Sequence, residues 1–257
     1  MRLFPRRLRH GEEATLVEHL GELRARIFVC LVALVAAFTV TYVFHHRILT
    51  WLNRPLPDDA GKPITLSPIE PFSTSIIVSL WAAFLLALPI LLWQLWAFLA
   101  PAFQEHRQRS VIALVAFATV LGAAGIAFGY YVVLPKAIHF LTNYDKEFFQ
   151  IQLRARDYYR FVCFVLVGVT AAFEVPVIVL GLVRLRIVTA ARLRHTWRMG
   201  VFLMTVIGVI LPGVDPVTTI LTVIPLVALY VLSIALASFF EPRWRGTHQT
   251  TTQASES

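Results

Sequence analysis

Six apolar segments alternate with polar ones along the 257-residue chain. At about 1.5 Å per residue, a helix needs roughly 20 apolar residues to cross a hydrocarbon core of about 30 Å. Five of the segments are near or above that length. The pattern therefore predicts an all-α integral membrane protein with six transmembrane helices, at about 27–44, 72–99, 110–134, 161–183, 198–211 and 217–238.

Several details modify this simple pattern. A short interfacial helix is expected from Thr15 into the first span, because a leucine stripe recurs there at helical spacing. Residues 45–71 and 135–160 are expected to be polar loops on one side of the membrane. Pro89 is the expected kink in the second span. The fifth span has only 13 apolar residues before Pro212, about 20 Å of helix, which predicts local thinning of the bilayer or an extended Arg198.

Composition agrees with a membrane domain. The chain is 58% hydrophobic and 15% charged, with a mean hydropathy of +0.70. Its net charge of +8 could indicate nucleic-acid binding, but the sequence has no RNA- or DNA-binding motif. It also has no enzyme signature, and its two cysteines lie inside apolar segments rather than at metal-binding spacing. No enzyme activity, metal or cofactor is expected.

The basic residues indicate an orientation. Six spans put both termini on one side, and that side carries 15 of the 23 Lys and Arg, counting residues 1–26, 104–109, 184–198 and 243–257. The positive-inside rule then places both termini in the cytoplasm, with a basic tail at 1–13 and a polar tail at 243–257 flanking one membrane domain at 14–242.

Glu174 is the only ionisable residue in the fourth apolar segment, close to mid-depth. A charged group there costs at least about 2.5 kcal/mol, so the helix is expected to turn this side chain toward protein or water and to keep it mostly protonated. Pro176, which lacks an N–H, opens the helical hydrogen bonding beside it. A proton-coupled or small-solute transporter, with Glu174 and Asp215 on one ion path, is an alternative function.

Four other polar residues have two interpretations each. Glu22 could bind a cationic ligand or pair with Arg26 four residues later. Glu70 could contribute to assembly or cap the second span. Gln94 could be functional or only form a hydrogen bond between helices. Asp215 could be functional or only cap the last helix.

Several motifs resemble the TatC family, the polytopic subunit of the twin-arginine protein translocase. They occur in the family's order and cover about residues 14–242: HLGELRARI (19–27), RPL (54–56), SPIEPF (67–72), QLWAFLAPAF (94–103), FGYYVVLP (128–135), FEVPV (173–177), PGVDP (212–216) and IP (224–225). The resemblance implies six spans, short fifth and sixth helices and a concave, glove-like bundle in the cell inner membrane. It also implies binding of twin-arginine signal peptides of folded cargo, an oligomeric complex with single-span TatA-like and TatB-like partners, and export driven by the proton-motive force.

The resemblance also assigns roles to residues. It implies signal-peptide binding by Glu22, Arg24, Phe98 and Glu105, an intramembrane polar role for Glu174 and Gln94, and a structural or assembly role for Pro55, Glu70, Pro135 and Asp215. One departure concerns the loop at 104–107, which reads Gln-Glu-His-Arg. Arg107 stands where the family has its second signal-binding glutamate. Either Glu105 replaces that contact, or this chain reads signals with one acid fewer, or it is a specialised paralogue.

Overall fold

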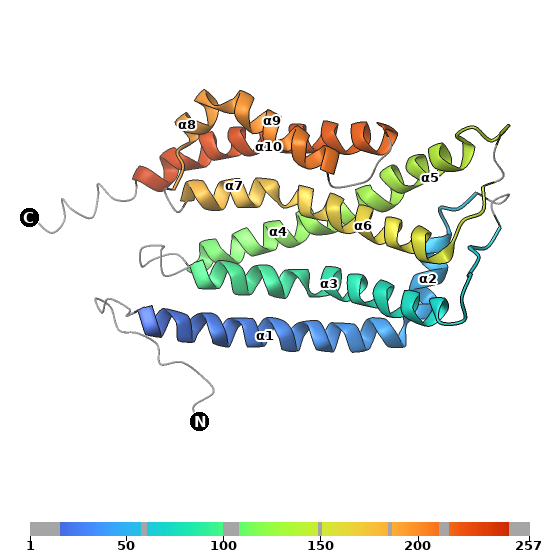
Figure 1. Cartoon of the computed structure of the whole chain (residues 1–257). Coiled ribbons are helices and arrows are strands. Elements are labelled where there is room, and N and C mark those ends of the chain that lie inside the picture. The colour runs from blue at the N-terminus through green and yellow to red at the C-terminus, as the bar shows by residue number, and fades with distance from the viewer. Residues whose placement is uncertain are drawn as a thin grey trace, which may run out of the picture.

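A computed structural model of the chain describes residues 16–57, 61–99, 108–148, 151–184, 187–210 and 216–246 (Figure 1). Within these residues, five helical segments are long and apolar enough to cross a membrane: Leu20–Val43, Glu70–Phe98, Ile112–Asn143, Ala155–Arg184 and Pro216–Phe239. A sixth apolar helix, Trp197–Ile210, is shorter. These six segments correspond to the six predicted spans, so the all-α prediction is confirmed.

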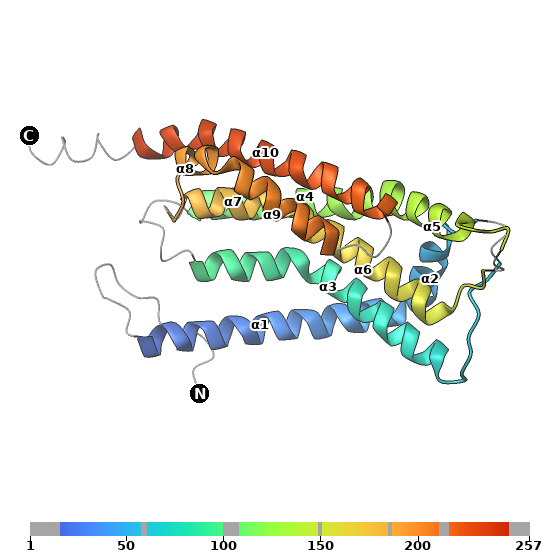
Figure 2. The same ribbon diagram turned by 45° about the horizontal axis from the view of Figure 1, so that its top comes forward.

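Successive membrane-spanning segments run in opposite directions, and some of them contain more than one helix. Their bounds are α1 (Leu16–Val43), α2 (His45–Asn53), α3 (Glu70–Leu99), α4 (Gln108–Phe128), the π-helix η3 (Gly129–Val133), α5 (Leu134–Asn143), α6 (Ala155–Phe173), α7 (Val175–Arg184), α8 (Ala190–His195), α9 (Trp197–Ile210) and α10 (Pro216–Gly246). Figures 1 and 2 show that α1 begins and α10 ends at the same end of the bundle, here the terminal end. The opposite end, where α2 lies and α3 and α6 begin, is the loop end.

α1 packs against α3 at one edge of the bundle. The contact is made by small residues, Ala37 of α1 with Ala83 and Ala87 of α3, which let the two backbones approach closely. A buried hydrogen bond adds to it, because Thr41 Oγ1 donates to the carbonyl of Ser79 at 2.8 Å. The other face of α1 exposes large apolar side chains, as expected for a helix at the lipid boundary.

α6 lies at the centre of the protein, and the span that contains it is the most deeply buried of those described. Val162, Val165 and Val169 are almost fully buried in the largest apolar cluster. Glycines of α4 and η3 face this helix at positions 122, 125 and 129. A β-carbon on Gly125 would lie 2.9 Å from the Cα of Thr170, so the absence of side chains sets the close approach of α4 to α6.

The third span and the two loops at the loop end are more helical than expected. Residues 45–53 form α2 and residues 134–143 form α5, so both predicted polar loops are partly helical. Pro135 lies at the start of α5, directly after η3, where its missing N–H interrupts the helical hydrogen bonding that continues from α4. The preceding interfacial helix and first span are likewise one continuous helix, α1.

The last two helices differ in length. α9 has 14 residues, about 21 Å, which confirms a short fifth span. α10 has 31 residues, so the expectation of a short sixth helix is wrong. The apolar part alone, Pro216–Phe239, has 24 residues, which is long enough to cross a membrane, and the helix continues beyond it to Gly246. Gly208 of α9 packs against Val223 of α10, which joins the pair.

Candidate functional site

The fourth span is interrupted at Glu174. α6 ends at Phe173 and α7 begins at Val175, and the Glu174 backbone has φ −79° and ψ −11°. Its N–H donates to the carbonyl of Ala171 at 3.2 Å, a tightened turn, and its carbonyl accepts from Val177 and Ile178 at 3.0 Å each. Pro176 explains the break, because a proline cannot donate the next helical hydrogen bond.

The Glu174 side chain points into the protein and is only 6% exposed. A β-carbon built on Gly122 of α4 would lie 2.9 Å from its Oε1 and 3.1 Å from Leu88 of α3. Both carboxyl oxygens are buried, and neither has a hydrogen-bond partner within the described ranges. The prediction that this acid faces protein rather than lipid is therefore confirmed.

Near the terminal end, Glu22, Arg26 and Gln94 form one network. Arg26 donates from Nε to Oε1 of Glu22 at 3.0 Å and from Nη2 to the same oxygen at 2.5 Å. Its third nitrogen, Nη1, donates to Oε1 of Gln94 on α3 at 3.2 Å. The expected i,i+4 pair and the expected interhelical bond of Gln94 are both present, and a single arginine links them.

Two further predicted binding residues lie at the same end. Arg24 is exposed on α1, and Phe98 lies half-buried one helical turn beyond Gln94 on α3. The structure thus brings four of the predicted residues, Glu22, Arg24, Gln94 and Phe98, to neighbouring turns of two packed helices. Glu105 and Arg107 lie outside the described residues.

At the loop end, Glu70 connects the segment that precedes α3 with the start of α6. This residue opens α3 and is 3% exposed. Its carboxylate accepts from Arg154 Nε at 2.9 Å and Nη2 at 3.3 Å, and from the N–H groups of Leu66 at 3.1 Å and Arg156 at 3.3 Å. The hydrogen bond to Glu70 raises the pKa of the Arg154 guanidinium. Glu70 lies in the first turn of α3, where an acid is favourable, but none of these donors belongs to that turn, so its carboxylate mainly joins other segments.

A backbone pairing reinforces this contact. The N–H of Ile64 donates to the carbonyl of Leu153 at 2.8 Å, and the N–H of Ala155 donates back to Ile64 at 2.8 Å. This short parallel bridge and the Glu70–Arg154 ion pair together form what we call the loop clasp. It ties the start of α3 to the start of α6.

Three tyrosines fix the end of α2, next to Pro55. The Tyr130 hydroxyl donates to the Trp51 carbonyl at 2.8 Å, and the Tyr158 hydroxyl donates to the Leu52 carbonyl at 2.6 Å. The Tyr159 hydroxyl donates to Oδ1 of Asn53 at 2.9 Å. These three tyrosines were not predicted from the sequence, although Tyr130 lies in the FGYYVVLP motif. Pro55 follows in a half-buried turn. The tyrosines therefore anchor the segment in which it lies.

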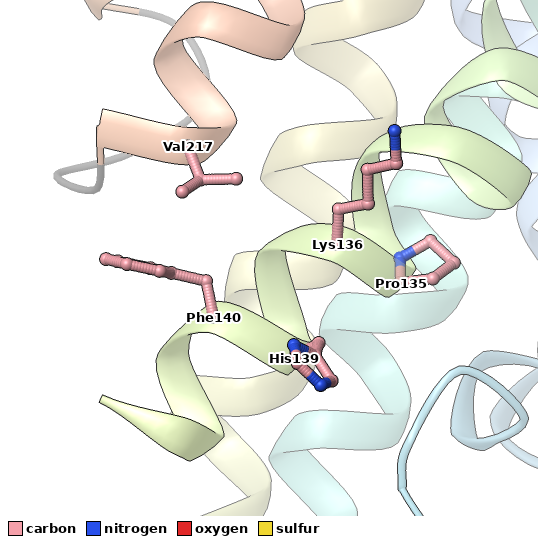
Figure 3. A pocket seen from close by; sticks show the side chains of 5 residues that line it. All are labelled: Pro135, Lys136, His139, Phe140 and Val217. Carbon is pink, nitrogen blue, oxygen red and sulfur yellow. The ribbon is translucent and has the colours of Figure 1, made fainter. Parts of the chain in front are cut away.

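An open pocket of about 500 Å³ lies between α5 and the start of α10 (Figure 3). It is lined by Pro135, Lys136, His139, Phe140 and Val217. Phe140 and Val217 extend toward the same space, whereas the Lys136 amine and the His139 ring point in different directions. Asp215 lies outside the described residues. Within the described ranges, no group of three or more His, Cys, Asp or Glu could hold a metal ion.

Comparison with known proteins identifies the family. Residues 18–225 match the family model for TatC, the Sec-independent protein translocase protein. The chain is 31% identical over 224 residues to TatC of Helicobacter pylori strain J99, covering 87% of this chain and 89% of the relative. It is 32% identical over 228 residues to TatCd of Bacillus subtilis, covering 89% and 93%, and 32% identical over 231 residues to the chloroplastic TATC of Arabidopsis thaliana, covering 89% and 68%.

Solved structures agree with this assignment. A crystal structure of the twin-arginine translocase receptor TatC in DDM superposes with a TM-score of 0.76 at 31% identity, covering 85% of this chain and 99% of that one. A second TatC crystal structure gives a TM-score of 0.75 and covers 86% and 98%. The residues that match the family model, 18–225, include Glu174 and the terminal-end network of Glu22, Arg26 and Gln94. The chain therefore belongs to the TatC family and is a core, non-enzymatic subunit of the twin-arginine protein translocase.

Proposed function

We propose that the terminal-end network is the receptor site for the paired arginines of twin-arginine signal peptides. A guanidinium binds a carboxylate best through two parallel hydrogen bonds, one to each oxygen. To begin binding, it needs one carboxylate oxygen that is accessible. Glu22 supplies one: both bonds from Arg26 fall on Oε1, and no hydrogen bond to Oε2 is present within the described ranges. Glu22 is 24% exposed, which leaves it reachable from solvent. That accessible oxygen is the observation that carries the proposal.

The neighbouring residues fit the same ligand. In this proposal Arg24, which is exposed, and Phe98, which is half-buried, contact the rest of the signal peptide, Arg24 through polar groups and Phe98 through apolar ones. Arg107 stands at the position of the family's second signal-binding glutamate. We propose that Glu105 serves as the second receptor acid instead. Charge reversal by Glu105→Lys should then weaken signal binding. An unchanged affinity would leave this chain with one receptor acid fewer.

Site-specific crosslinking tests the receptor site. A photoreactive twin-arginine signal peptide should crosslink to the intact protein in membranes, and Glu22→Gln should remove most of that product. Glu147→Gln is the matched control, because it removes one exposed carboxylate at the loop end. Equal crosslinking by the Glu22→Gln variant and the unmodified protein would overturn the assignment.

Orientation and partners complete the proposal. With the terminal end in the cytoplasm of a cell whose plasma (inner) membrane holds the protein, the receptor site faces signal peptides before export. The exposed apolar faces of the outer helices suit single-span TatA-like and TatB-like partners. Membrane-impermeant labelling of single cysteines at positions 20 and 66 tests the orientation, and co-purification with each partner tests assembly. The transporter alternative has no support in the similarities to known proteins.

A further inference from the structure

Arg26 already occupies the carboxylate that the proposed function assigns to the signal peptide. Its guanidinium gives two hydrogen bonds to Glu22 and one to Gln94, so all three of its nitrogens have acceptors. The two bonds to Glu22 converge on a single oxygen, Oε1. An incoming arginine that binds both carboxylate oxygens would therefore meet a guanidinium of the same charge on one of them.

We propose that Arg26 is an internal competitor for the receptor carboxylate and that signal binding is an exchange of one arginine for another at Glu22. This inference rests on the proposed function, because it takes Glu22 as the receptor acid. Two guanidinium groups sharing one carboxylate repel each other, so full engagement of the ligand requires Arg26 to release Oε1.

Gln94 makes this release possible. Its Oε1 accepts from the nitrogen of Arg26 that does not bind Glu22, so the bond at 3.2 Å can persist when the other two are lost. The Arg26 side chain is 23% exposed, which lets the freed nitrogens turn toward water or lipid headgroups. Gln94 therefore holds the displaced arginine beside α3.

The competition has a measurable size. A partly exposed i,i+4 ion pair contributes little, and its loss on binding lowers ligand affinity by about two- to fivefold. Removing Arg26 should raise the affinity by that factor. A residue that only positions Glu22 would have the opposite effect, because its removal would let the carboxylate adopt other rotamers and weaken binding.

The test uses the full-length protein in lipid nanodiscs and a fluorescent peptide carrying a twin-arginine signal, read by anisotropy. Arg26→Gln should bind the peptide about two- to fivefold more tightly than the unmodified protein. Arg194→Gln, which removes one exposed positive charge from α8 at the same end, gives the effect of charge alone. Gln94→Leu should change the affinity little, with or without Arg26→Gln, because the bond from Arg26 to Gln94 is present both before and after the exchange.

Measurements in the Glu22→Gln variant separate the receptor role of Glu22 from the exchange of arginines. In Glu22→Gln, adding Arg26→Gln should give no gain. If Glu22→Gln alone leaves affinity unchanged, the proposed receptor role fails, and the exchange fails with it. If Glu22→Gln weakens binding but Arg26→Gln fails to tighten it beyond the Arg194→Gln control, only the exchange is overturned. Should Arg26→Gln not fold, Arg26→Lys keeps the charge without the planar fork and should give a smaller gain in the same direction.

Discussion

Gly122 of α4 lies so close to Glu174 that a β-carbon added to it would sit 2.9 Å from Oε1 of the carboxyl. Real β-carbons essentially never approach other atoms this closely, so the Glu174 carboxyl would have to shift, and Leu88 at 3.1 Å is a second tight contact. We predict that Gly122→Ala lowers the free energy of unfolding by about 1–3 kcal/mol through overpacking. Equilibrium unfolding in detergent measures it. Gly21→Ala is the control, since nothing lies within 4 Å of its β-carbon, and equal stability of the two variants would contradict the close contact.

Glu174 itself is expected to act as a neutral polar group. Neither oxygen has an ion-pair or hydrogen-bond partner within the described ranges, so an uncharged amide of the same size should fit. We predict that Glu174→Gln keeps the export rate within about a factor of two, while Glu174→Ala loses most of it. Export of a twin-arginine reporter protein in cells lacking their own TatC measures both. A Gln variant as inactive as the Ala variant would mean that ionisation is required.

Within the loop clasp, Arg154 should contribute more to the stability of the protein than Arg156. Arg154→Ala removes two hydrogen bonds from the buried Glu70 carboxylate, whereas Arg156→Ala leaves the backbone N–H bond of residue 156 intact. We predict a clearly lower unfolding temperature for Arg154→Ala and little change for Arg156→Ala. Thermal unfolding in detergent gives both values. Similar effects of the two substitutions would show that the ion pair carries no particular weight.

Gly200 of α9 faces Tyr230 of α10, and a β-carbon on Gly200 would overlap the tyrosine hydroxyl and ring. We predict that Gly200→Ala destabilises the protein by about 1–3 kcal/mol. Adding Tyr230→Leu should recover part of that loss, because it removes the overlapping ring. The unfolding free energies of the two single variants and the double variant form a cycle. Strictly additive effects would contradict direct contact between these helices.

The sequence was sufficient for features that depend on local composition. The length of each apolar segment decides whether a helix crosses a membrane, so the number and order of the six spans were predictable, although the first begins 7 residues earlier and the third ends 9 residues later than expected. The burial of Glu174 was predictable for a related reason, since a carboxyl at mid-depth has to turn away from lipid.

Contacts between distant residues were not predictable from one sequence. Glu70 pairs with a residue 84 positions away, and Arg26 reaches Gln94 across 68 positions. The helices α2 and α5 were expected as loops because they are short, and α2 is held both by the tyrosines and by its own side chains in the largest apolar cluster. The glycines at 122, 125 and 129 also passed unnoticed, because their spacing has meaning only once α4 lies against α6.

The loop clasp has a mechanical consequence for the whole bundle. Because hydrogen bonds fix the starts of α3 and α6 to each other, these two helices cannot slide or separate where they begin. Any angular movement between them must pivot about that fixed point, and the displacement grows with distance along each helix. The largest relative motion therefore falls some 40 Å away by helix length, at the tip of α3 that carries Gln94 and Phe98.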